Sequence, residues 1–99
     1  MVEREELESL EREVSATPGE FAHGLRNAFP EGLSGSLLEF RVRHGAAEME
    51  IHLIPGPDRV IALLRLPTLT VHIRFIAGDA AARTRLLRRM DLAMQRGGG

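Results

Sequence analysis

Four histidines and 14 acidic residues are the side chains of this chain with the clearest capacity for chemistry. The strand register predicted below places four residues in one row across one sheet face: Glu39, His52, Ile61 and His72. In that row His52 neighbours Glu39, which favours a surface ion pair. His72 is expected two strands away, about 10 Å from His52 at ~4.8 Å per strand. Because zinc ligands lie only about 2 Å from the ion, the sequence predicts no metal site.

Motifs of common catalytic sites are missing from the sequence. It contains no Gly-x-Ser-x-Gly, no phosphate-binding loop, no Gly-x-Gly-x-x-Gly and no His-Glu-x-x-His. The glycine-rich stretch 32–36 leads into a predicted strand, so it lacks the helix N-terminus that would bind an anion. With no cysteine, thiol catalysis, thiolate zinc sites and iron–sulfur clusters are excluded. We therefore expect a protein that is not an enzyme and binds no cofactor.

Arginines near the C-terminus are the main candidate for an anion-binding surface. Four of them fall on one arc of a predicted helix, opposite its apolar residues: Arg85, Arg88, Arg89 and Arg96. Residues 1–50 carry 11 acidic residues against five arginines, whereas residues 51–99 carry eight arginines against three acidic residues. The basic face is thus expected either to be neutralised by the acidic N-terminal segment or to contact nucleic-acid phosphates. Nucleic-acid binding is the less favoured of the two, because the sequence has no Trp or Tyr and all four phenylalanines are predicted to point into the core. No aromatic side chain is then left on the surface for bases to stack on.

The C-terminal tail Gly98-Gly99 resembles the terminal Gly-Gly of ubiquitin-like proteins and bacterial sulfur carriers. The resemblance covers two residues and implies a flexible terminal glycine that is adenylylated and then carries sulfur or forms an isopeptide bond. In those families the tail follows the last strand of a β-grasp fold, whereas here it follows a predicted helix. A carrier role is therefore a remote alternative.

Two alternating runs, 37–43 and 48–54, predict the elements that position these side chains. A turn at 44–47 pairs residues whose numbers sum to 91. One face then holds three apolar pairs, Val42 with Met49, Phe40 with Ile51 and Leu38 with Leu53. The other holds three polar pairs, Arg43 with Glu48, Arg41 with Glu50 and Glu39 with His52. A slip of one residue would mix the two faces, so the register is strongly specified.

Two further strands are predicted at 59–66 and 68–76. The turn sequence 55–58 precedes the first, which is almost continuously apolar and is therefore expected to be covered on both faces or to lie at an interface. Pro67 separates the two runs, and the inward set changes from even to odd numbers across it. A tight turn explains the change, as does a bulge in one long bent strand; we favour the turn, because a single strand here would exceed the usual length.

Helices are predicted at both ends of the chain. Thr17-Pro18-Gly19-Glu20 is a capping box with proline at the first helical position, and Pro30 ends that helix. Asp79 is a good N-cap for the C-terminal helix, which Gly97 is expected to end. An acidic, partly ordered helix with a stripe of Leu7, Leu10 and Val14 is expected within residues 3–14.

These elements predict a single α+β domain over residues 1–99, a four-stranded antiparallel meander with two N-terminal helices and one C-terminal helix. We expect residues 1–15 to be acidic and partly ordered and residues 97–99 to form a flexible glycine tail. No apolar run is long enough to span a membrane and no secretory signal is evident. All 13 basic residues are arginine and none is lysine, which suggests a GC-rich bacterial genome. With no predicted membrane span or secretory signal, we expect a cytoplasmic protein.

The leading functional hypothesis is a small non-enzymatic interaction or adaptor domain that acts through protein contacts. Five large aliphatic residues are predicted on the outward sheet face: Leu37, Ile54, Ile61, Leu63 and Ile76. Exposed patches of this kind mark partners, so we predict a homodimer centred on Ile61 and Leu63. An N-terminal helix lying over the same face is an equally weighted alternative.

Overall fold

A computed structural model of the protein describes residues 9–98, and the expectations for residues 1–8 and Gly99 fall outside them. Its N-terminal elements are β1 (Ser9–Val14), α2 (Pro18–Ala28), β2 (Leu33–Ser36), β3 (Glu39–His44) and β4 (Ala47–Pro55). Its C-terminal elements are β5 (Arg59–Ile61), β6 (Leu64–Leu66), β7 (Leu69–Ala77) and α3 (Ala80–Gly98). The fold is thus α+β. No helix in the described range is long and apolar enough to cross a membrane.

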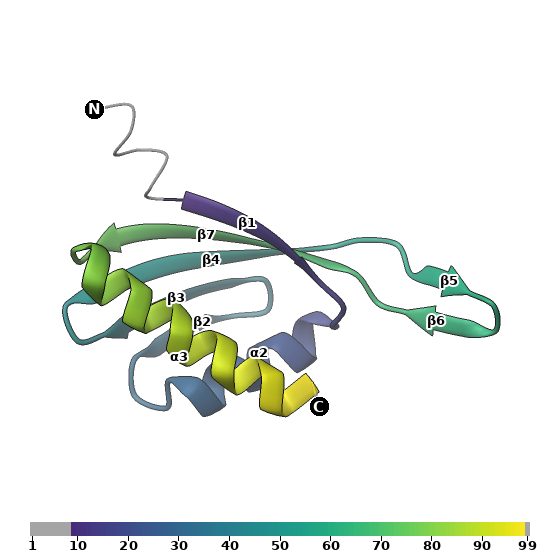
Figure 1. The fold of residues 1–99 in the computed structure, drawn as a ribbon, viewed down its shortest axis with the longest axis horizontal. Helices are drawn as coiled ribbons and strands as arrows, with labels where there is room; N and C mark the ends of the chain where they lie inside the picture. The colour runs from purple at the N-terminus through teal and green to yellow at the C-terminus, as the bar shows by residue number, and fades with distance from the viewer. Residues whose placement is uncertain (1–8, 99) are drawn as a thin grey trace.

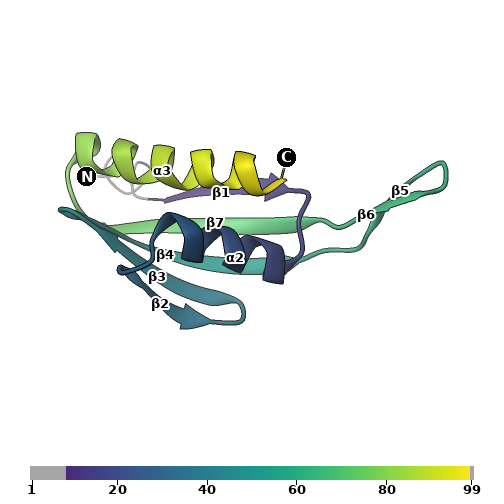
Figure 2. The ribbon, with the colours of Figure 1, turned by 90° about the horizontal axis from the view of Figure 1, so that it is seen from below.

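Five strands form an antiparallel sheet in the order β1-β7-β4-β3-β2 (Figure 1). Both helices cover the same face of this sheet (Figure 2). Between them and the sheet lies one hydrophobic core, to which α2 contributes Phe21 and Leu25 and α3 contributes Leu86 and Met90. The predicted four-stranded meander was wrong in strand number and order, because β1 and β2 were not anticipated as members of the sheet.

The predicted register between β3 and β4 is confirmed. Opposing residue numbers sum to 91 along the whole pairing, from Glu39 opposite His52 to His44 opposite Ala47. Phe40, Val42, Met49 and Ile51 are buried beneath the helices, whereas the alternate residues face away from them. Alternation therefore determined this pairing, because one face is covered and the other is not.

The prediction for residues 59–66 was wrong. β4 and β7 pair directly, with Ile51 opposite Ile73, and form the two sides of one long hairpin. Its far end continues as a separate two-stranded arm, residues 59–66, which projects from the body of the protein (Figures 1 and 2). The turn expected at Pro67 is instead the two-residue loop Ala62-Leu63 at the arm tip, and Pro67 marks where the arm joins β7. The sequence 55–58, which resembled a tight turn, is where the chain leaves the sheet.

The expected N-terminal helix was also wrong, since Ser9–Val14 is the edge strand β1. It pairs antiparallel with β7, from Ser9 opposite Arg74 to Val14 opposite Leu69. The burial pattern alternates along it, with Leu10 and Val14 packed against the core. The four-residue spacing of Leu10 and Val14 suits either a strand or a helix over so short a segment, and pairing with the open edge of β7 decides in favour of the strand.

Both remaining helices are confirmed with their predicted N-caps. The predicted end of the C-terminal helix was wrong, because α3 continues to Gly98, so Gly97 does not end it and residues 97 and 98 are helical instead of forming a glycine tail. In α2 the Thr17 hydroxyl accepts from the Glu20 amide at 3.1 Å, and the Glu20 carboxylate accepts from the Thr17 amide at 2.8 Å. In α3 the Asp79 carboxylate accepts from the Ala82 amide at 2.9 Å. These contacts satisfy backbone donors that the first helical turn leaves free, and so they set where each helix begins.

Candidate interaction surfaces

The arm formed by β5 and β6 is the most exposed apolar feature of the described chain. Leu63 at its tip is 100% exposed, and Val60, Ile61 and Leu64 are between 51% and 62% exposed. Cross-strand pairing places Ile61 beside Leu64 on one face of the arm and Val60 beside Arg65 on the other. The near-continuous apolar run in the sequence was the signal for this surface, and its exposure shows that the run is not covered on both faces within the chain.

The arm contacts the body of the protein mainly at its root. An Arg59 nitrogen lies 3.4 Å from a Glu13 carboxylate oxygen of β1, and the Ser15 hydroxyl donates to the Pro67 carbonyl at 3.0 Å. The Thr68 hydroxyl donates to the Pro57 carbonyl at 2.7 Å within the root itself. These contacts hold the base, whereas the four aliphatic side chains beyond it belong to no part of the hydrophobic core.

The five residues predicted to form one outward patch do not lie together. Ile61 and Leu63 belong to the arm, whereas Leu37 lies in the loop between β2 and β3. Ile54 faces outward near the arm end of β4, and Ile76 lies near the opposite end of β7. The error follows from the assumed pairing of His52 with Ile61, which placed the arm residues within the sheet.

A groove of about 780 Å³ opens between the N-terminal half of α2, the C-terminal half of α3 and the end of β1. Its wall is mostly apolar and includes Phe21, Val71, Met90 and Met94. Its mouth carries the charged residues Arg12, Glu20 and Asp91. The sequence showed no sign of this groove, because three elements distant in the chain create it.

The helix-free face of the sheet is polar and internally paired. Arg41 lies 2.6 Å from the Glu50 carboxylate and 3.6 Å from the Glu48 carboxylate. Arg43 also pairs with Glu48, and Arg74 also pairs with Glu50. The charged side chains of this face therefore form ion pairs with one another. A face covered by ion pairs is a poor candidate for the apolar interface that we predicted there. Each exposed pair in it contributes roughly 0–1 kcal/mol.

The predicted separation of His52 from His72 was wrong, because β7 lies next to β4. The two histidines are direct cross-strand neighbours, with Glu39 beside His52 and Glu11 beside His72. The Nε2 atom of His72 lies 3.0 Å from a Glu11 carboxylate oxygen. Across residues 9–98, however, no group of three histidines or carboxylates is arranged to hold a metal ion.

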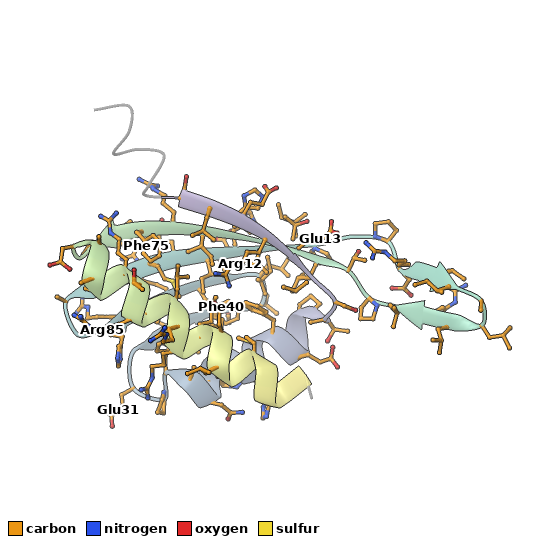
Figure 3. The ribbon with its side chains drawn as sticks, viewed as in Figure 1. Arg12, Glu13, Glu31, Phe40, Phe75 and Arg85 are labelled. Carbon is orange, nitrogen blue, oxygen red and sulfur yellow. The ribbon has the colours of Figure 1, made fainter. Side chains whose placement is uncertain are left out.

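The arginines of α3 do not act as one surface. Arg85 and Arg88 have exposed side chains, and Arg85 lies on the outward side of the helix (Figure 3). Arg89 instead donates to the Ala28 carbonyl at 2.6 Å and stacks 5.9 Å from the Phe29 ring centre, so it links α3 to the end of α2. The Arg96 side chain lies outside the part of the chain that the structure describes.

The acidic N-terminal segment was expected to pair with the arginines of α3, but its described ion pairs are made with other residues. Arg12 of β1 pairs with Asp91 of α3, so here the strand supplies the positive charge and the helix the negative one (Figure 3). Glu11 contacts His72 and Glu13 contacts Arg59, both on the side away from α3. The expectation for the acidic residues before Ser9 lies outside the described residues.

No protein-family model matches the sequence, and a search of curated proteins finds no significant match.

Proposed function

We propose that this protein is a non-enzymatic interaction domain whose arm, residues 59–66, binds a protein partner. The observation that carries the proposal is the fully exposed Leu63 at the tip of an arm with three further exposed aliphatic side chains. Exposed apolar clusters on a globular protein usually mark a contact surface. A helix-covered core that does not include the arm leaves these residues available for such a contact.

The loop chemistry at the tip supports a binding role. Ala62 has a φ of 53°, and hairpin loops of two residues prefer glycine where the first residue has positive φ. The tip instead presents Ala62-Leu63, which is less favourable for the backbone and places a large apolar side chain in water. Strained backbone that persists at an exposed site is a reason to look for function there.

A photo-crosslinking amino acid at position 63, incorporated in cells that naturally make the protein, tests the proposal. Light should generate a discrete protein adduct at this position. The matched control is the same substitution at Leu92, an exposed aliphatic residue that belongs to α3 and not to the arm. Adducts that are equally abundant at both positions, or absent at position 63, would overturn the proposal.

Two exposed arginines, Arg85 and Arg88, support the alternative of a nucleic-acid-associated protein. Titration with duplex DNA and RNA at two salt concentrations tests it, because phosphate contacts weaken steeply as salt rises. Loss of binding on replacing both arginines by Glu would support that alternative over the arm. We place either activity in the bacterial cytoplasm; the use of arginine for all 13 basic residues supports the bacterial origin.

A further inference from the structure

We infer that the partner of the arm is a second copy of this chain, with the arm of each copy docked in the groove between α2 and α3 of the other. This inference rests on the proposed function of the arm and names its occupant. It places Leu63 of one copy against the apolar wall formed by Phe21, Met90 and Met94 of the other. Both interfaces of such a two-fold dimer are identical.

The groove opens beside the root of the arm. Ser15 lines the groove, and its hydroxyl donates to the Pro67 carbonyl where the arm joins β7. Val14 and Ser15 also line a smaller pocket with Arg59 and Thr68 of the root. The groove and the base of the arm are therefore neighbours within each copy.

This neighbourhood makes the exchange geometrically consistent. When two arms lie side by side and antiparallel across a two-fold axis, the tip of each arm reaches the root of the other. The groove mouth lies at that root, so the tip reaches an apolar wall. The arrangement requires no change in the body of either copy, because the arm already projects away from it (Figure 2).

The chemistry of the two surfaces is complementary. The arm presents Ile61 and Leu64 behind its tip, and its two arginines are paired with acids of the same copy, Arg59 with Glu13 and Arg65 with Asp58. In the groove Arg12 is likewise paired with Asp91, and the Glu20 carboxylate accepts from the Thr17 amide. An apolar tip therefore meets an apolar wall, and the charges around both surfaces already have partners within each copy.

The stability of the arm also favours a partner that is always present. A two-stranded hairpin is only marginally stable by itself in water. Each arm of the dimer would gain a second hairpin beside it and a covered tip. Self-association supplies this cover wherever the protein is made, without a second gene product.

Light scattering across micromolar to millimolar concentrations measures the dimer. We expect Leu63→Asp to weaken dimerisation about thirty-fold or more, as for a central hot-spot residue. Gly19→Trp should weaken it by at least about ten-fold from the groove side, because a large side chain there fills the mouth. Gly19 lines the groove and is exposed, and a Cβ atom there would meet only the Thr17 hydroxyl oxygen, at an ordinary contact distance of 4.0 Å, so we expect the substitution to leave the fold intact. Leu92→Asp is the control and should leave dimerisation unchanged.

Crosslinking distinguishes the arm-in-groove arrangement from other dimers. The chain has no cysteine, so Leu63→Cys and Gly19→Cys each introduce a unique thiol. A short bismaleimide should join the two variants when they are mixed and should join neither variant to itself. Strong self-crosslinking of Leu63→Cys would show tip-to-tip contact and would overturn the inference.

A wild type that stays monomeric up to millimolar concentration would overturn the dimer. The photo-crosslinking experiment then decides the fate of the proposed function separately. An adduct with a different protein at position 63 would retain the arm as a binding element, whereas no specific adduct would remove both proposals.

Discussion

At the scale of single residues, charges on the helix-free sheet face pair with one another instead of serving a ligand. Arg41 sits between Glu48 and Glu50, and Glu50 is shared with Arg74 of the neighbouring strand β7. The neighbour β7 was not expected there, and it adds a contact that the isolated hairpin would lack. The network therefore distributes the effect of any single substitution over several partners.

Arg41→Glu is expected to lower the free energy of unfolding by no more than about 1 kcal/mol, because the pairs are exposed and screened. It replaces the 2.6 Å contact with Glu50 by a repulsion between carboxylates. Adding Glu50→Arg should recover part of the loss, with Arg74 limiting the recovery through its own contact with Glu50. Urea unfolding of both single variants and the double variant measures the coupling, and a coupling of zero would contradict the pairing.

At the scale of elements, the long hairpin has two structurally distinct parts, the strands β4 and β7 within the sheet and the strands β5 and β6 in the arm. Its inner part is buried under α2 and α3, whereas its outer part is the exposed arm. Pro57 and Pro67 lie at the junction, where each lacks the amide that would continue the ladder. The sheet and the arm are thus separable units of structure.

Replacing residues 57–67 by Asn-Gly should leave the five-stranded sheet folded. The new loop would connect Gly56 to Thr68, whose backbones are already hydrogen-bonded at 3.0 Å. In dilute solution we expect the free energy of unfolding to change by less than about 2 kcal/mol, since only exposed root contacts are lost. Circular dichroism and urea unfolding test this, and a shortened chain that fails to fold would make the arm integral to the core.

At the scale of the whole molecule, the structure is asymmetric, with a helix-covered core at one end and an apolar arm at the other (Figure 1). The exposed apolar arm and the apolar groove beside its root are the two features on which we base the proposed reciprocal dimer. A reciprocal dimer uses both features at once, whereas a monomer would leave them both in water.

Thermal unfolding should therefore depend on protein concentration. Above the dimer dissociation constant, the melting temperature should rise by about 3 °C for each tenfold increase in concentration, as linkage requires for a dimer that unfolds to monomers. Leu63→Asp should remove this dependence without lowering the melting temperature of the dilute protein, since its side chain touches no core residue. A wild-type melting temperature that is independent of concentration would contradict self-association.

Local patterns were sufficient to determine part of this protein from sequence. The capping box at Thr17, the N-cap at Asp79 and the register of β3 with β4 depend on residues within about ten positions of one another. Their energetic terms, a side chain that satisfies a helix amide or a cross-strand pair, act over the same short range.

Tertiary structure alone decided which strands are neighbours. β1 and β7 are more than fifty residues apart, and their pairing turned an expected helix into an edge strand. The same rearrangement brought His52 beside His72 and moved residues 59–66 out of the sheet into the arm. Alternation tells which residues share a face, but it does not tell which strand lies beside which. That choice depends on how α2 and α3 together cover one sheet, and the groove beside the arm is a product of that packing.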